Sequence, residues 1–263
     1  MKAQAQPEVY LEFLERLQSA PTRVLLLDYD GTLAPFQTDR ARAFPYPEVP
    51  ALLGRISQAG TRVILITGRP AREVVLLSGL HPHPEIWGSH GLERLSPDGT
   101  YRVDSLMPEQ ETGLLQAAEI LRSHNLEPRM EIKPGSVALH WRGSPQAEIE
   151  AFRHLIVPLW SPLVEACSLQ VLDFDGGVEI RVRDRDKGRA VRAILEECSS
   201  SAAVAYLGDD FTDEDAFHAL RGRGLTALVR EEPRQTFADI QLRPPQELIR
   251  FLEDWVNTTG GQD

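Results

Sequence analysis

The chain has 263 residues, of which 42% are hydrophobic and 25% charged, a composition typical of a folded globular protein with one large domain or two smaller ones. Its net charge of −11 argues against nucleic acid and anionic membrane surfaces as partners. No apolar segment reaches the roughly 20 residues that a bilayer requires, and residues 1–17 lack the pattern of a signal peptide. We therefore expect a cytoplasmic protein.

Four short apolar runs do not alternate with polar residues, a pattern typical of strands buried on both faces of a parallel sheet. They are residues 24–27, 63–66, 204–207 and 226–229. Helices are expected over residues 47–59, 71–78, 187–198 and 213–220. This alternation predicts an α/β fold, a doubly wound Rossmann-like core with a parallel sheet. Ligands bind at the carboxyl ends of such strands, where Asp28, Thr67 and Asp209 follow apolar runs.

The middle of the chain has a different order, in which one helix and two strands occur twice. The expected helices are residues 109–124 and 145–159, and the expected strands are 129–132, 137–141, 169–172 and 178–182. Polar and apolar residues alternate over the last strand, which predicts a sheet with one polar face. We expect an α/β cap domain over residues 108–183, inserted into a catalytic core made of residues 1–107 and 184–263. The alternating Arg and Asp of residues 181–189 predict a solvated link.

The segment from Asp28 to Thr32 places two carboxylates, two residues apart, where a buried strand ends. Asp28 could attack phosphorus as a nucleophile. Asp30 could protonate the leaving oxygen and later deprotonate water, and Thr32 with nearby backbone N–H groups could hold phosphate oxygens. The alternative is a turn at Asp30 and Gly31 with Asp28 as a cap. That alternative does not explain a second acid at the end of a buried strand.

A second acidic cluster, residues 208–215, follows another apolar run. With Thr212 as a helix N-cap, acids in the first turn would explain Asp213 but not Asp209 and Asp210. Carboxylate oxygens from two strand ends suit Mg²⁺ better than zinc. We therefore expect Asp209 to bind a metal together with Asp28. Asp210 and Asp213 stay open between direct ligands and residues that only position the ligands.

Two further segments complete a possible phosphoryl-transfer site. Thr67 and Gly68, with Arg69, end a strand and open a helix, so Thr67 could offer phosphate its hydroxyl and its backbone N–H. Lys187 begins another helix and could offset the charge of a transferring phosphoryl group. A single lysine is most often a solvated surface residue, so the hypothesis depends on the order of all four segments.

The order of these four segments resembles that of the haloacid dehalogenase superfamily, and their residues resemble those of the trehalose-6-phosphate phosphatases within it. Matching segments in the middle of the chain are Gly88 to Gly91, Lys133, His140 to Arg142, and Glu179 to Arg181. The resemblance implies catalytic roles for Asp28, Asp30, Thr67 and Lys187. It implies Mg²⁺ on Asp28, the Asp30 backbone carbonyl and Asp209, with Asp213 near it. It implies substrate binding by Thr32, Gly68, Arg69, His90, Gly91, Lys133, His140, Arg142, Glu179 and Asp210.

The expected reaction is hydrolysis of trehalose 6-phosphate to trehalose and phosphate through an aspartyl phosphate. Three alternatives stay open at this point. One is a phosphatase for another sugar phosphate, such as glucosylglycerate phosphate or sucrose phosphate; another is a phosphomutase; the third is a non-catalytic scaffold that binds a sugar phosphate. The chain carries no synthase domain, so a separate trehalose-6-phosphate synthase is an expected partner.

Overall fold

The computed structural model describes residues 7–37, 39–174 and 176–260. They form two compact units. The core unit comprises the residues up to Tyr101 together with those from Asp186, and the inserted unit is Arg102–Arg185.

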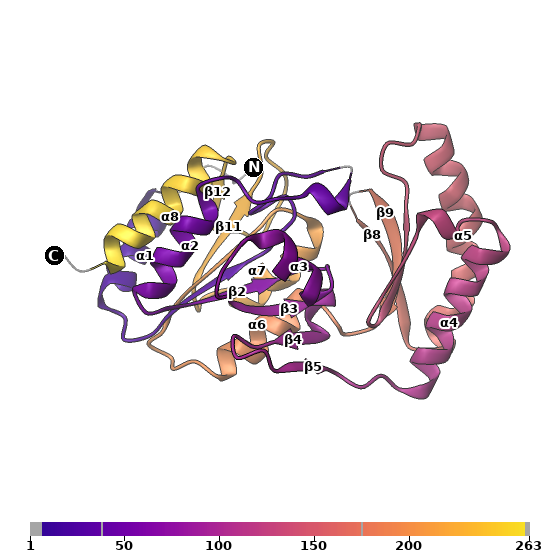
Figure 1. The fold of residues 1–263 in the computed structure, drawn as a ribbon, viewed down its shortest axis with the longest axis horizontal. Coiled ribbons are helices and arrows are strands. Elements are labelled where there is room, and N and C mark those ends of the chain that lie inside the picture. Colours follow the sequence, from indigo (N-terminus) through magenta and orange to yellow (C-terminus); the bar gives the residue numbers. More distant parts are fainter. Residues whose placement is uncertain (1–6, 38, 175, 261–263) are drawn as a thin grey trace. The chain divides into compact units, whose positions relative to one another are not determined.

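The core unit is built on an eight-stranded sheet in the order β12-β11-β10-β1-β2-β3-β4-β5 (Figure 1). The strands are β1 Arg23–Leu27, β2 Thr61–Ile66, β3 Glu85–Gly88, β4 Glu93–Leu95, β5 Tyr101–Val103, β10 Ala203–Gly208, β11 Leu225–Val229 and β12 Ile240–Leu242. From β12 to β3 all neighbours are parallel, whereas β4 is antiparallel to β3. Leu27 pairs with Leu207 and with Leu65. The residues that follow these three strands therefore leave the sheet at one edge, as the doubly wound prediction requires.

Helices cover both faces of this sheet. One face packs against α1 Pro7–Ser19, α2 Val49–Gln58, α3 Ala71–Ser78 and α8 Gln246–Thr259, and the other packs against α6 Lys187–Glu196 and α7 Glu214–Leu220. Short 3-10 turns lie at η1 Arg40–Arg42, η2 Ser89–Gly91 and η4 Phe211–Asp213. Alternate residues of β1 serve the two faces, with Leu25 in one apolar cluster and Val24 in the other. The central strands of the sheet are thus buried on both sides, which explains their continuous apolar runs.

The inserted unit is a two-layer structure. Its antiparallel sheet has the order β6-β7-β9-β8. The strands are β6 Met130–Lys133, β7 Ser136–His140, β8 Leu169–Phe174 and β9 Gly177–Val182, with η3 Glu127–Arg129 before β6. One face of this sheet packs against α4 Pro108–Ser123 and α5 Gln146–Ala166. Trp160 is fully buried between the layers and donates its indole N–H to the carbonyl of Ala117 at 3.2 Å.

Helix α5 is longer than the sequence pattern predicts. The expected helix ended at residue 159, but α5 continues to Ala166 and contains Pro158 and Pro162. Proline in a helix interior removes an N–H and crowds the preceding turn. Burial of Ile156, Trp160 and Leu163 on one side of the helix stabilises it despite this cost.

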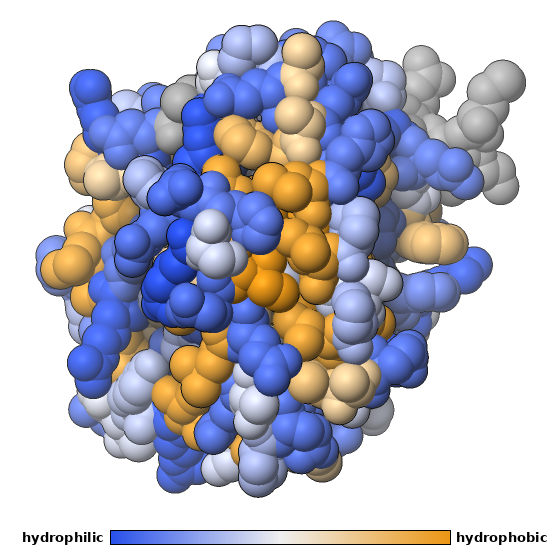
Figure 2. Space-filling view, turned by 90° about the vertical axis from the view of Figure 1, so that its right-hand side faces the viewer, coloured by the Kyte–Doolittle hydropathy of each residue, from blue (hydrophilic) through white to orange (hydrophobic). Residues whose placement is uncertain are grey.

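The outer side of α4 and α5 is partly apolar. Figure 2 shows apolar side chains gathered on the face of the inserted unit that carries α4 and α5. Leu115 of α4 and Leu155 and Leu159 of α5 are exposed. Within residues 7–260, apart from the two that are not described, no helix combines the length and apolarity needed to cross a membrane.

Candidate active site

Four of the predicted residues meet at the carboxyl edge of the core sheet. Asp28 follows β1, Asp209 follows β10 and Asp213 ends η4, and each places a carboxylate oxygen within 4.8 Å of the others. Lys187, the first residue of α6, donates from Nζ to Asp28 Oδ1 at 2.6 Å and to Asp213 Oδ1 at 2.7 Å. The structure thus confirms that the acidic segments and the lysine lie side by side.

The carboxylate of Asp213 is fully occupied by hydrogen bonds. Its Oδ1 also accepts from the Tyr206 hydroxyl at 2.5 Å, and its Oδ2 accepts from the backbone N–H of Asp209 at 3.0 Å and of Asp210 at 2.9 Å. Asp213 therefore holds Lys187 and the Asp209 loop in place. Tyr206 was not predicted as a site residue, although it is the one residue with a polar tip in the apolar run 204–207.

The start of the α7 segment differs from the alternative in which Thr212 is the helix N-cap. Asp210, and not Thr212, is the N-cap of η4, because its Oδ1 accepts from the Phe211 N–H at 2.7 Å. One oxygen of Asp210 is thereby committed to the turn. The acids at residues 209–213 shape this loop as well as carrying charge.

The remaining oxygens fit a divalent cation. Asp209 Oδ1 is buried and has no hydrogen-bond partner in the described part of the chain, and a buried carboxylate oxygen without a partner is costly. Gly31 lies directly against it, with φ +79°, and a Cβ there would fall 2.0 Å from Asp209 Oδ2. Asp28 and Asp209 offer the hard oxygen ligands that Mg²⁺ prefers. The donor set and the glycine that makes room for it are therefore consistent with Mg²⁺.

Burial sets the electrostatics of this cluster. Loss of solvation raises the pKa of Asp28 to about 7; Lys187 opposes the shift and Asp213 adds to it. Loss of solvation, followed by the charge of Asp28, also raises the pKa of Asp209 well above its usual range. Burial alone would lower the pKa of Lys187, but Asp213 and Asp28 hold it above its usual value. A cation beside Asp28 and Asp209 would favour their charged forms.

Two threonines were predicted to hold phosphate. Thr32 Oγ1 is buried and without a hydrogen-bond partner among the described residues, so it is free to contact a phosphate oxygen. Thr67 Oγ1 accepts from the Arg69 N–H at 3.1 Å, which leaves the hydroxyl proton for a ligand. The Thr67 backbone N–H donates to the Trp87 carbonyl at 2.9 Å. The prediction that this N–H contacts phosphate is therefore wrong for this arrangement.

Arg69 holds two carboxylates. Its Nε and Nη2 donate to Asp30 Oδ2 at 2.5 Å and to Asp30 Oδ1 at 2.6 Å, and its Nη1 donates to Glu73. The Arg69 side chain is only 2% exposed, whereas that of Asp30 is 27% exposed. The structure thus places Arg69, which was predicted to bind substrate, in a bidentate contact with Asp30. Glu73 was not identified from the sequence.

The loop at His90 and Gly91 supports the Thr67 segment. The His90 N–H donates to the Thr67 carbonyl at 2.9 Å. The His90 ring lies so close to Gly68 that a Cβ there would be 2.7 Å from its Cε1. His90 has φ +55°, a backbone conformation that non-glycine residues rarely adopt and that often marks functional loops. His90 thus positions the segment that was predicted to hold phosphate.

Polar residues of the inserted unit lie on the sheet face opposite its helices. Lys133 Nζ pairs with Glu179 Oε1 at 2.5 Å, and the Ser136 hydroxyl donates to the same oxygen at 2.9 Å. His140 Nε2 contacts Glu131 Oε2 at 2.7 Å. Lys133 and Glu179 therefore form an ion pair that is almost completely buried. Ser136 and Glu131 were missed because only strand register brings them here.

Two arginines of the inserted unit belong to the predicted or matching segments. Arg142 lies against Gly176, where a Cβ would be 2.5 Å from Arg142 Cγ. Arg181 is 4% exposed, and its Nε and Nη1 are buried with no hydrogen-bond partner among the described residues. The expectation of a solvated link beginning at Arg181 is wrong at that residue.

Comparison with known proteins identifies the family. A family model described as trehalose-phosphatase matches residues 26–241. The chain belongs to the trehalose-phosphatase family. A probable trehalose-phosphate phosphatase H of Arabidopsis thaliana is 28% identical over 90% of this chain and 74% of its own length. A trehalose-phosphate phosphatase of Mycobacterium marinum is 30% identical over 89% of this chain and 61% of its own length.

Solved structures agree on the fold. The C-terminal domain of trehalose-6-phosphate phosphatase from C. albicans superposes with a TM-score of 0.77 at 20% identity, covering 99% of each chain. A trehalose-6-phosphate phosphatase from Aspergillus fumigatus superposes with a TM-score of 0.67 at 24% identity, covering 97% of this chain and 100% of the other. At this identity the likeness establishes the fold, a parallel α/β core with an inserted α/β unit.

Proposed function

We propose that this protein is a Mg²⁺-dependent phosphatase that hydrolyses trehalose 6-phosphate to trehalose and phosphate in the cytoplasm. A separate synthase would supply the substrate. The observation that carries the proposal is the buried cluster at the sheet edge, in which Lys187 contacts Asp28 while Asp209 keeps a carboxylate oxygen without a partner. Membership of the trehalose-phosphatase family gives the substrate.

In the first step, a carboxylate oxygen of Asp28 forms a bond to phosphorus. The bond between phosphorus and the sugar oxygen breaks, and Asp30 gives its proton to that oxygen, so trehalose leaves as a neutral alcohol. Lys187 neutralises charge beside Asp28, and Thr32 and Thr67 hydrogen-bond the phosphoryl oxygens. The products of this step are trehalose, an acyl phosphate on Asp28 and the Asp30 carboxylate.

In the second step, Asp30 accepts a proton from water while the water oxygen bonds to phosphorus. The bond between phosphorus and Asp28 breaks, which releases inorganic phosphate and restores both carboxyl groups to their starting forms. Asp28 and Asp209 would hold Mg²⁺, which supplies positive charge to the phosphoryl group when bound. Asp213 holds Lys187 and the Asp209 loop in position during both steps.

We propose that the inserted unit is the cap that determines substrate specificity, with Lys133, His140, Arg142 and Glu179 binding sugar hydroxyls. The pairing of Lys133 with Glu179 gives these two residues a fixed geometry, because each is held by its oppositely charged neighbour. A sugar hydroxyl can accept from the lysine and donate to the glutamate at the same time.

Glu179→Gln and Lys133→Met should lower kcat/KM for trehalose 6-phosphate by roughly 10- to 150-fold, because each removes a charge-assisted hydrogen bond worth about 1.5–3 kcal/mol. Hydrolysis of 4-nitrophenyl phosphate, which has no sugar, should change by less than about threefold. The measurement is kcat/KM for both substrates in both variants.

Arg153→Ala is the matched control. Arg153 pairs with Asp173 at 2.6 Å, and both side chains are half exposed on the inserted unit. Exposed pairs contribute at most about 1 kcal/mol, so this variant should keep both rates. Equal losses on the two substrates in Glu179→Gln would contradict a sugar-binding role.

A further inference from the structure

Asp30 and its neighbours form a chain of alternating charges in the core unit. Arg69 binds both oxygens of Asp30 and also binds Glu73. The second carboxylate oxygen of Glu73 lies 3.7 Å from Arg40 Nη2. Neither Glu73 nor Arg40 has a place in the phosphoryl-transfer steps above.

The contact between Arg69 and Asp30 conflicts with the proposed reaction. A general acid must direct a proton at the leaving oxygen. Here both oxygens of Asp30 accept hydrogen bonds from one guanidinium, so neither oxygen is directed at a leaving group. Asp30 must therefore leave Arg69 before it can protonate the sugar oxygen.

Separation of the Asp30 carboxylate from Arg69 would normally be unfavourable. The Arg69 side chain is 2% exposed, and a buried charge that loses its partner is strongly destabilised. Glu73 reduces this cost because it already accepts from the third guanidinium nitrogen of Arg69, Nη1. The guanidinium keeps a carboxylate partner whether or not Asp30 is bound.

We propose that Glu73 is a positioning residue that allows Asp30 to exchange between Arg69 and the leaving group. This inference rests on the proposed role of Asp30 as the acid. Without Glu73, Asp30 would be the only carboxylate among these contacts of Arg69 and would stay bound to it. The acid step would slow while nucleophilic attack by Asp28 would not.

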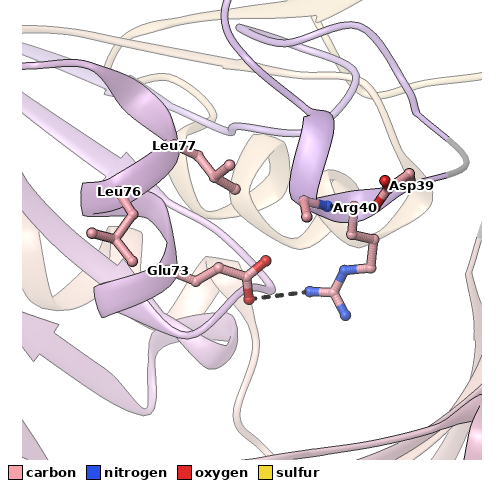
Figure 3. Close-up of a pocket in the computed structure, with 6 residues that line it drawn as sticks. Asp39, Arg40, Glu73, Leu76 and Leu77 are labelled. Atoms are coloured by element: carbon pink, nitrogen blue, oxygen red, sulfur yellow. Dashed lines mark hydrogen bonds and ion pairs between the residues drawn. The ribbon is translucent and has the colours of Figure 1, made fainter.

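The surroundings of Glu73 suit this role. Figure 3 shows Glu73 projecting from α3 toward Arg40 of η1. Both residues line a hollow of about 490 Å³, together with Leu76 and Leu77. The Glu73 side chain is 34% exposed. Its carboxylate can therefore follow small movements of Arg69 without losing solvation, and Glu73→Gln should be tolerated by the fold.

Glu73→Gln should lower kcat/KM for trehalose 6-phosphate about tenfold or more, a part of the roughly 100- to 10,000-fold that general acid catalysis supplies. The rate with 4-nitrophenyl phosphate, whose leaving group departs without a proton, should fall by less than about threefold. Glu73 also lies in the first turn of α3, where an acid stabilises the helix. Loss of that stabilising role alone would lower both rates equally.

Arg40→Ala and Arg69→Met complete the experiment. Arg40→Ala leaves the contact between Glu73 and Arg69 intact, so both rates should stay within about twofold of the parent. In an Arg69→Met background, adding Glu73→Gln should no longer change the ratio of the two rates, because no guanidinium then holds Asp30. Equal losses on both substrates, or an unchanged effect of Glu73→Gln in Arg69→Met, would overturn the proposal.

The comparison of phenyl phosphate with 4-nitrophenyl phosphate separates this proposal from the substrate assignment. Phenyl phosphate has the poorer leaving group, so Glu73→Gln should slow its hydrolysis more, whichever sugar phosphate the enzyme prefers. Failure of trehalose 6-phosphate as a substrate of the parent enzyme would refute the proposed function alone. Equal effects of Glu73→Gln on the two aryl phosphates would refute the role of Glu73 alone.

Discussion

Asp28→Asn should abolish phosphate release from trehalose 6-phosphate, to below a few per cent of the parent rate. An amide nitrogen or oxygen cannot form the acyl phosphate that the proposed first step requires. Phosphate release and covalent labelling of the protein during turnover are the measurements. Activity well above that level in a preparation free of parent enzyme would rule out Asp28 as the nucleophile.

The fold of this variant should be intact, which makes the result interpretable. Asn is nearly the size of Asp, and Lys187 keeps its contact with Asp213 at 2.7 Å. Burial raises the pKa of Asp28, so its charged form is unfavourable in the metal-free protein. Replacing it with a neutral side chain should leave the melting temperature of the metal-free protein unchanged or higher.

Removal of divalent cations should have an effect of similar size. A chelator should abolish activity, Mg²⁺ should restore it and Ca²⁺ should not, because Ca²⁺ takes more ligands at longer distances and would draw the Asp28 carboxylate out of line. Asp209→Asn should raise the Mg²⁺ concentration required for activity steeply. Full activity of a preparation that contains no metal would contradict the site.

Stability provides a second measurement of the same cluster. Because the folded state raises the pKa of Asp209, the metal-free folded protein binds more protons than the unfolded chain above the usual Asp pKa. The free energy of unfolding should then fall as the pH rises, so the metal-free protein should melt higher at about pH 5 than at about pH 8. Asp209→Asn should weaken this dependence and raise the melting temperature at the higher pH. A parent protein whose stability increases over this range would contradict the electrostatic account.

The sequence predicts the central part of the fold well because its strands carry a strong pattern. The runs at residues 24–27, 63–66, 204–207 and 226–229 all belong to strands of the core sheet. They are buried on both faces, and burial on both faces gives short continuous apolar stretches that distinguish these strands from strands with one solvated face. The outer strands β4 and β12 have three residues each, too few for a period to show, and neither was predicted.

The acidic segments of the site could also be predicted, whereas their partners could not. Asp28 and Asp209 stand at strand ends, where parallel topology brings them together. Tyr206 and Glu73 act through contacts that depend on side-chain direction and long-range packing. Nothing local in the sequence distinguishes Glu73 from any other acid in a first helical turn.

The measurement that tests the central claim most directly is kcat/KM for phosphate release across a panel of sugar phosphates with Mg²⁺ present. The panel contains trehalose 6-phosphate, glucose 6-phosphate, sucrose phosphate and glucosylglycerate phosphate. Two or more charge-assisted contacts to the sugar should favour trehalose 6-phosphate by about 100-fold or more. Equal values across the panel, preference for another sugar, or no phosphate release from any of them would contradict the proposed function.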